Sequence, residues 1–333
     1  MPELSVILIS KNQAWNIRRL IESVIHHTTA VFSREITLVD SASTDETTAY
    51  ASEYAINVLQ LHTDQHLSPA AGRYVGYKHT TGDLILFLDG DMELHPEWLR
   101  HALHILRTQP EVAVITGVTV DISPTETAGS VAHVTASPDA TTTDVPYVAG
   151  AALYRRQALD QVGCFNPYLY SDEEPELCIR IRQAGNRIVQ LHMPIAYHYS
   201  TPSEALSTLV NRWRRNLYLG AGQSLRYHLG RKTFWPYLWE RGYGLIPGLG
   251  LLVGAASVVW SVARQHWHWF GLWFLLFVGV LVIDIYRKQS VSLTVASLLK
   301  RLLIVDGTVR GFFLKPLDPQ SYPEKLDVIK QVN

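Results

Sequence analysis

Residues 83–91 read Asp-Leu-Ile-Leu-Phe-Leu-Asp-Gly-Asp, a short apolar run that ends on two carboxylates one residue apart. An apolar stretch of this length, bounded by a turn, is typical of a strand that is buried on both faces. Gly90 favours a turn directly after the strand. We therefore expect Asp89 and Asp91 at the carboxyl end of a strand, where open α/β sheets bind their ligands.

The sequence on either side repeats this pattern. Short apolar runs alternate with helical stretches, which predicts an α/β fold with a mainly parallel, Rossmann-like sheet in three layers. Asp40 ends one of these runs, so it should lie at the same sheet edge as Asp89. The expected strands cover residues 4–10, 35–40, 56–61, 83–88 and 112–116.

Asp89 and Asp91 have the chemistry of a metal site. Mg²⁺ and Mn²⁺ prefer oxygen ligands and keep coordination positions open for phosphate oxygens. A metal held here would stabilise a departing pyrophosphate. An isolated Asp-Gly-Asp is also a common acidic turn, and its place after the fourth strand favours the metal interpretation. Asp40 can accept hydrogen bonds from a nucleobase or ribose, or it can simply cap the loop that follows.

Two further groups are candidates for the same site. Residues 172–176 contain four acids in five positions, and one of them is a candidate general base for an acceptor hydroxyl. Such a cluster is also typical of a solvated helix N-terminus. Crowded like charges would raise the pKa of the base. His198 follows an expected strand over 187–191 and is a candidate third metal ligand, although a lone histidine is more often structural.

Composition separates the chain into two halves. Its 333 residues, 47% of them hydrophobic, suffice for one large domain and an accessory region. Residues 1–200 carry 23 acids and 13 bases, whereas residues 201–333 carry 7 acids and 16 bases. Because the basic half is also the apolar half, we expect it to face anionic lipid and not nucleic acid. The two cysteines have no redox or metal spacing, and the N-terminus lacks a signal-peptide pattern, so we expect a cytoplasmic first half.

Two later stretches are long enough to cross a bilayer. Residues 242–263 and 265–283 contain no charged side chain, and a helical span needs roughly 20 residues. The turn between them is rich in tryptophan, as at a lipid–water interface. Basic residues cluster outside the pair, so the positive-inside rule predicts that both outer ends are cytoplasmic. The alternative is a buried or interfacial hairpin, because Pro247 and Asp284 weaken the spans.

Taken in order, these segments resemble the inverting family 2 glycosyltransferases, which have the A-type glycosyltransferase fold. One of them, Val39–Asp45, departs from the family pattern at two positions, since Ser41 and Ala42 stand where the family has Asp-Gly. The segments that carry the resemblance are Ser5–Asn12, Val39–Asp45 (V-D-D-G-S-x-D), Gly72–Gly76 (A-R-N-x-G), Phe87–Asp91 (F-L-D-x-D) and Glu173–Gly185 (E-D-x-[DE]-L-x-x-R-x-x-x-x-G).

The resemblance implies roles for particular residues. Glu174 takes the position of the catalytic base, with Glu173 and Asp172 as alternatives because the register of the acids is open. Arg212-Trp213 is similar to the Q-x-x-R-W motif of membrane-bound polysaccharide synthases, but Leu209 replaces the glutamine. Arg212 and Arg215 would bind a diphosphate or a lipid phosphate. The implied donor-binding residues are Ser10, Asn12, Asp40, Arg73 and Asp89, and the implied metal ligands are Asp89 and Asp91, with His198 as the candidate third.

The resemblance implies a nucleotide-sugar-binding catalytic domain over 1–220, on the cytoplasmic side of a cell membrane. Residues 221–333 should be helical, with a transmembrane hairpin at about 242–263 and 267–286 and an amphipathic interfacial helix after it. The implied enzyme uses Mg²⁺ or Mn²⁺ to move a sugar from a nucleoside-diphosphate sugar to a hydroxyl of a lipid-linked or polysaccharide acceptor, with inversion.

Three other functions are compatible with parts of this pattern. A polyprenyl-phosphate sugar synthase would use a phosphate acceptor. A nucleotidyltransferase is the second, but it normally has a glycine-rich loop after the first strand. Residues 10–14 contain no glycine, which counts against this function. A membrane scaffold that binds nucleotide without catalysis is the third.

Overall fold

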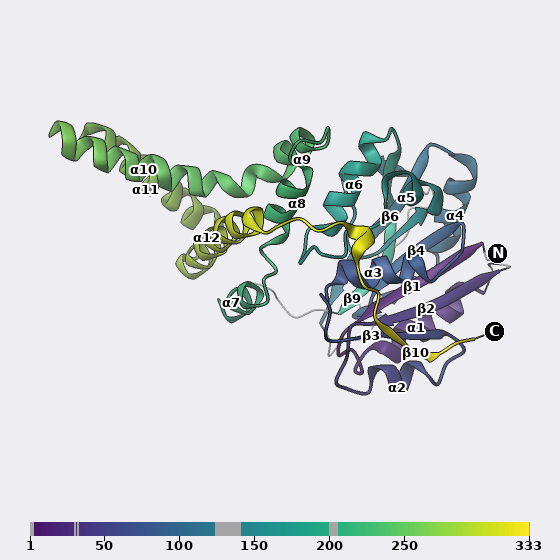
Figure 1. The fold of residues 1–333 in the computed structure, drawn as a ribbon. Helices are drawn as coiled ribbons and strands as arrows, with labels where there is room; N and C mark the ends of the chain where they lie inside the picture. The colour runs from purple at the N-terminus through teal and green to yellow at the C-terminus, as the bar shows by residue number, and fades with distance from the viewer. Residues whose placement is uncertain (1–2, 30, 32, 124–140, 200–205, 333) are drawn as a thin grey trace. The chain divides into compact units, whose positions relative to one another are not determined.

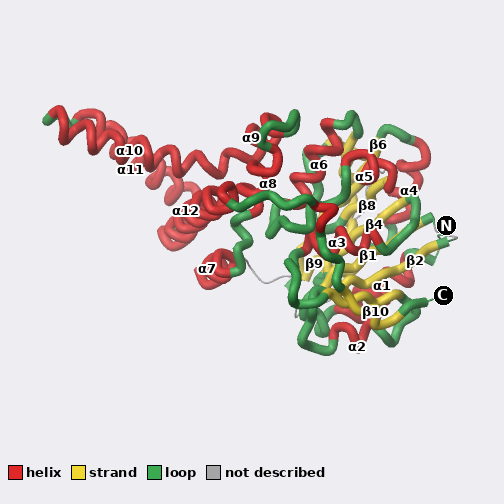
Figure 2. Tube along the Cα trace, viewed as in Figure 1, coloured by secondary structure: helices red, strands yellow, loops and turns green. Residues whose placement is uncertain are grey.

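The computed structural model describes residues 3–29, 31, 33–123, 141–199 and 206–332 (Figure 1). The chain divides into a first unit, Met1–Thr201 with Leu317–Asn333, and a second unit, Pro202–Pro316. Every strand in the described part of the chain belongs to the first unit, whereas the described part of the second unit is helical (Figure 2). The boundary between the units lies before residue 220, the expected position, and the C-terminal tail belongs to the first unit and not to the helical region.

Four parallel strands form the half of the sheet that the sequence predicted. Their order is β3-β2-β1-β4, and the register sets Ser10 opposite Asp40 and Ile9 opposite Asp89. The carboxyl ends of β1, β2 and β4 are therefore level with one another. The bounds are β1 (Leu4–Ser10), β2 (Arg34–Asp40), β3 (Asn57–Leu61) and β4 (Leu84–Asp89).

The other half of the ten-stranded sheet is mixed. β8 (Ala152–Arg155) lies antiparallel between β4 and β6 (Val112–Ile122), and β6 runs parallel to β9 (Arg187–Tyr199). β5 (Met92–Leu94) and β7 (Thr142–Asp144) each pair antiparallel with β9. The α/β fold is confirmed, and its parallel pairing is limited to the first four strands and the β6–β9 pair.

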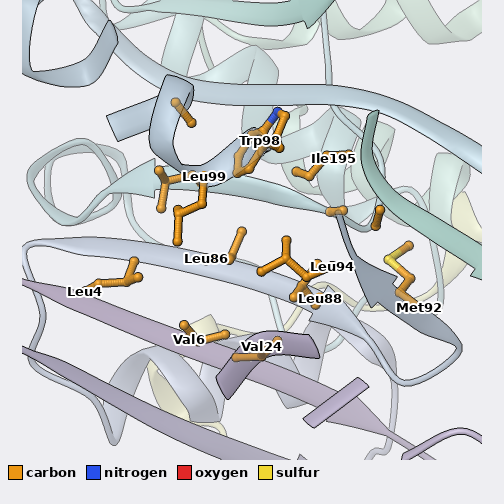
Figure 3. Close-up of a cluster of buried hydrophobic side chains, with 14 of the residues drawn as sticks. Leu4, Val6, Val24, Leu86, Leu88, Met92, Leu94, Trp98, Leu99 and Ile195 are labelled. Carbon is orange, nitrogen blue, oxygen red and sulfur yellow. The ribbon is translucent and has the colours of Figure 1, made fainter. Parts of the chain in front are cut away.

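Helices cover both faces of this sheet and make the predicted three layers. Because side chains alternate along a strand, Leu86 and Leu88 of β4 pack on one face while Ile85 and Phe87 pack on the other. Figure 3 shows the first cluster, in which Leu4, Val6, Leu86 and Leu88 meet Val24 and Trp98. That face is covered by α1 (Ile17–His27), α2 (Thr47–Ala51) and α4 (Trp98–Thr108), and the opposite face by α3 (Pro69–Lys78), α5 (Arg156–Val162) and α6 (Glu173–Gln183).

The C-terminal tail completes the first unit. After a short 3₁₀ turn, η3 (Pro319–Ser321), strand β10 (Leu326–Lys330) pairs antiparallel with β3 and covers a sheet edge that would otherwise be open. Tyr322 is buried, and its hydroxyl donates to the carbonyl of His66 at 2.6 Å. Its ring lies edge-on to those of Tyr74 and Tyr168. The tail is therefore part of the core.

Tyr322→Ala should lower the free energy of unfolding of the first unit by about 3 kcal/mol, because it opens a cavity among aromatic rings. Tyr322→Phe keeps the ring and should cost about 1 kcal/mol through the lost hydrogen bond. Urea unfolding followed by near-ultraviolet circular dichroism measures both. Val328→Ala, at a side chain that is 54% exposed on β10, is the control and should change little. Equal stability of the two alanine variants would contradict a core role for the tail.

The second unit contains the two apolar stretches. Phe234–Arg264 and His268–Lys288 are long enough to cross a membrane, and the most apolar 18-residue windows within them have mean hydropathies of 1.9 and 2.1. Many of their large apolar side chains are exposed, because no other described part of the chain covers them. This exposure suits contact with lipid. The elements of this unit are α7 (Leu206–Arg214), α8 (Gly220–His228), α9 (Phe234–Arg241), η2 (Gly242–Leu245), α10 (Ile246–Arg264), α11 (His268–Lys288) and α12 (Val291–Phe313).

Candidate active site at the carboxyl ends of the central strands

The Asp89-Gly90-Asp91 turn links β4 to β5. The side-chain amide of Asn16 donates to the carbonyls of Gly90 and Met92, at 3.1 and 2.9 Å, and holds the turn from the first loop. A Cβ atom on Gly90 would lie 2.7 Å from Cγ of Gln13, so the turn has no room for a side chain there. The carboxylates of Asp89 and Asp91 are 32% and 31% exposed, and both remain accessible to a ligand.

Arg73 of α3 joins this turn to the acidic start of α6. Its guanidinium is buried, and Nη2 lies 2.8 Å from Oδ1 of Asp89 and 2.9 Å from Oε1 of Glu174. Nη1 donates to Oε1 of Glu173 at 2.7 Å. The structure thus brings together three motifs that lie far apart in the sequence. Arg73, one of the implied donor-binding residues, binds three carboxylates.

His198 lies near the end of β9, beside the turn. Its Nε2 is 3.5 Å from Oδ2 of Asp91, and its Nδ1 is 2.7 Å from Oδ1 of Asp121. These two carboxylates, Asp91 first, raise the pKa of His198 to about 9, against the opposing effect of burial. The histidine therefore lies between two carboxylates, and its role as a metal ligand stays a prediction.

Asp40 is fully buried at the end of β2. It accepts hydrogen bonds from the Ser10 hydroxyl at 3.0 Å, the Ser43 backbone at 2.7 Å and the Gln60 amide at 3.1 Å. Asn12 has a left-handed backbone (φ 55°), and its side chain accepts from the backbone of Thr44 at 2.8 Å. Ser10, Asn12 and Asp40 thus form one network. In this network Asp40 caps the loop that follows β2, which is the second of its two expected roles.

The comparison with protein families decides the identity of this chain. Residues 5–170 match the model of "Glycosyl transferase family 2". The chain belongs to this family. The resemblance to this family is therefore confirmed. The segments from Ser5 to Asp91 lie inside the matched region, whereas Glu173–Gly185 lies beyond it.

Two curated relatives of this glycosyltransferase match part of it. "Glycosyltransferase AglE" of Haloferax volcanii is 30% identical over 125 residues, which is 37% of this chain and 38% of the relative. "Polypeptide N-acetylgalactosaminyltransferase 6" of Bos taurus is 31% identical over 129 residues, which is 37% of this chain and 21% of the relative. The matched segment spans between about a fifth and two fifths of these relatives.

Solved structures confirm the A-type glycosyltransferase fold. The mannosyltransferase PcManGT of Pyrobaculum calidifontis, in complex with GDP-Man and Mn²⁺, has a TM-score of 0.64 at 16% identity, covering 94% of this chain and 87% of that one. Residues 1–349 of S. aureus TarS, in complex with UDP-GlcNAc, have a TM-score of 0.51 at 19% identity, covering 99% and 97%. At these identities the likeness concerns the fold.

The glycosyltransferase site carries excess negative charge. Burial is the main cause that raises the pKa of Asp89, to about 6, and the charges of Glu174 and Asp91 add to it against the effect of Arg73. Burial and the neighbouring Glu174 likewise raise the pKa of Glu173. Among the described residues, five carboxylates, if ionised, would face Arg73 and a protonated His198 in this cluster, which leaves three negative charges uncompensated. Such a site attracts a divalent cation.

The residues present fit Mg²⁺ or Mn²⁺ at Asp91. Among the described residues, no three His, Cys, Asp or Glu side chains already form a metal cluster. However, Oδ1 of Asp91 is buried with no hydrogen-bond partner in the described part of the chain. The 3.5 Å between Asp91 Oδ2 and His198 Nε2 is close to the separation of about 3 Å between adjacent ligands of an octahedral ion. Asp89 is less free, because Arg73 holds one of its oxygens and Gly150 packs against the other.

Two expected site residues lie in the other unit, and three residues that contact the site were not expected. Arg212 and Arg215 lie in the second unit, in and just after α7, so the geometry of the first unit does not test them. Asp121, Gln60 and Gly150 contact expected site residues but were not predicted, since none stands in a motif. The pairing register of β6 and β9 is the signal that locates Asp121.

Proposed function

We propose that this protein transfers a sugar from a nucleoside-diphosphate sugar to an acceptor hydroxyl, with inversion, using Mg²⁺ or Mn²⁺ and a carboxylate base. The observation that carries this proposal is the Arg73 network. One buried guanidinium contacts Asp89 at the turn and Glu173 and Glu174 at the start of α6. A donor held at the turn would therefore lie close to a candidate base.

On the donor side, Asp91 and His198 would hold the cation. When bound, the cation neutralises the diphosphate and helps it to leave. Ser10 and Asn12 would hold the nucleoside at the end of β1, in a loop region that Asp40 caps and orders. A sugar-nucleotide donor is supported by two fold neighbours, of which one is described with GDP-Man and Mn²⁺ and the other with UDP-GlcNAc.

On the acceptor side, Glu174 is the best candidate for the base. A base must reach the proton that it removes. The Glu174 side chain is 17% exposed, whereas that of Glu173 is 6% exposed and held by Nη1 of Arg73. Glu174 would take the hydroxyl proton while the acceptor oxygen bonds to the anomeric carbon. The bond from that carbon to the diphosphate oxygen breaks, and the diphosphate keeps the electron pair.

Glu174→Gln should lower transfer by about 10²-fold, because the amide cannot take the proton. The measurement is transfer of labelled sugar to a membrane extract at saturating donor. Glu97→Gln, at an exposed residue of the α4 N-terminus that pairs with Arg100, is the control and should retain full activity. Nearly unchanged transfer by Glu174→Gln would instead favour the polyprenyl-phosphate acceptor, which needs little base catalysis.

We further propose that α10 and α11 anchor the enzyme in a cell membrane, with the first unit in the cytoplasm. The support is the length, hydropathy and exposure of these helices and the basic residues outside the pair. The acceptor would then be lipid-linked or a glycan at the membrane, and Arg212 and Arg215 would meet a lipid phosphate. Full extraction from cell membranes by alkaline carbonate without detergent would contradict this anchoring.

The activity itself is tested by turnover. We expect at least one of a panel of UDP-, GDP- and dTDP-sugars to release nucleoside diphosphate when Mg²⁺ or Mn²⁺ and a membrane extract are present. Chelation with EDTA should abolish the release. A nucleotide-binding scaffold without catalysis would show no release with any donor and metal, and that result would overturn the proposed function.

A further inference from the structure

We propose that Asp121 is a positioning residue, which orients His198 so that its Nε2 can bind a divalent cation together with Asp91. This inference rests on the proposed function. The direct observation is the 2.7 Å contact between Oδ1 of Asp121 and Nδ1 of His198. The other ring nitrogen points to Asp91, 3.5 Å away.

The backbone places these three side chains together. In the pairing of β6 with β9, Asp121 stands opposite His198, and in the pairing of β5 with β9, Met92, the neighbour of Asp91, stands opposite the same histidine. Asp121 thus reaches the turn from the other side of β9.

An irregularity in the sheet creates this arrangement. Thr116 pairs with Gln190, an offset of 74 residues, whereas Thr119 pairs with Ala196, an offset of 77, because the register shifts on both sides of Val118. Had the earlier offset continued, Asp121 would stand opposite Ile195, a fully buried core residue. Such irregularities often redirect a side chain beside an active site. Here the shift brings a carboxylate to His198.

The chemistry of the pair suits a metal ligand. A histidine that binds a metal through Nε2 needs a proton on Nδ1 and a fixed ring, and a carboxylate that accepts from Nδ1 provides both. The Asp121 side chain is 77% exposed, and exposed ion pairs contribute little to folding. Orientation of His198 is therefore a better explanation of this contact than a contribution to folding stability.

The test uses Mn²⁺ alone and the full chain in detergent. Electron paramagnetic resonance of free Mn²⁺ gives the Kd for wild type, Asp121→Asn, Asp121→Ala and His198→Ala. We expect both Asp121 variants to bind Mn²⁺ about 10- to 100-fold more weakly than wild type, with an unchanged unfolding temperature. Asp144→Asn is the matched control, because Asp144 is also exposed, at 66%, and pairs with Arg187 away from the turn. It should bind like wild type.

A second readout reports on the histidine itself. The ¹⁵N shifts of the His198 ring should show the Nδ1–H tautomer in Mn²⁺-free wild type at high pH, and a mixture of tautomers in Asp121→Ala. If the Asp121 variants bind Mn²⁺ within twofold of wild type while His198→Ala has lost binding, the role of Asp121 is overturned and the metal site stands. If wild type itself shows no saturable Mn²⁺ binding, the metal ligands of the proposed function are overturned as well.

Discussion

Asp91→Asn is expected to lower metal-dependent sugar transfer by about 10³-fold while the fold stays intact. Asp91 has one buried oxygen without a hydrogen-bond partner in the described residues and another that faces His198 at 3.5 Å. The amide removes the charge that would hold the cation. Release of nucleoside diphosphate at saturating Mn²⁺ measures the loss, and thermal unfolding reports on the fold.

The control for this variant lies at the opposite end of β4. Asp83 is exposed just before the other end of β4, so Asp83→Asn makes the same chemical change away from the site. It should leave transfer within twofold of wild type. An Asp91→Asn enzyme that keeps more than a tenth of wild-type transfer would show that Asp91 does not hold the metal.

Arg73→Met is expected to cost about 3–5 kcal/mol of the free energy of unfolding and to abolish donor binding. The change removes a buried cation that contacts Asp89, Glu173 and Glu174, and leaves three carboxylates close together. Arg73→Lys keeps the charge but lacks the two Nη groups that reach separate carboxylates, so its loss should be intermediate. Urea unfolding of the first unit measures the loss.

The loss in Arg73→Met should also depend on pH. Burial already raises the pKa of Asp89 to about 6 and raises that of Glu173, and removal of Arg73 would raise both further. A carboxyl with a raised pKa in the folded state destabilises the protein more as the pH rises through that pKa. The difference from wild type should therefore shrink from pH 8 to pH 5. Arg100→Met, which removes only an exposed partner of Glu97, should show neither effect.

The parallel half of the fold was predictable because its strands are continuous apolar runs. The apolar runs at residues 4–10, 35–40, 56–61 and 83–88 predict β1 to β4, and the carboxyl ends of β2 and β4 locate Asp40 and Asp89. Strand β8 has four residues and β5 has three, too short for a periodic pattern. β10 lies near the C-terminus but pairs with β3, and a local sequence pattern does not predict which distant strand a segment pairs with.

The site was predictable as a set of residues but not as a set of contacts. The motifs placed Arg73, Asp89 and Glu174 in one site, and the structure adds that Arg73 binds the other two directly. Asp40 could either bind a base or cap its loop, and only the hydrogen bonds from Ser10 and Ser43 distinguish these. Asp121 depends on the register shift at Val118, which the sequence does not encode in any recognisable pattern.

On the proposed function, the turn at Asp89–Asp91 binds the diphosphate of a sugar nucleotide through a divalent cation. Calorimetric titration of the full chain with UDP and with GDP, in Mn²⁺ and in EDTA, tests it most directly. We predict saturable binding of at least one of them in Mn²⁺, with at least tenfold weaker binding in EDTA and in Asp91→Asn. Binding of neither nucleotide, or equal binding in Mn²⁺, in EDTA and in Asp91→Asn, would contradict the claim.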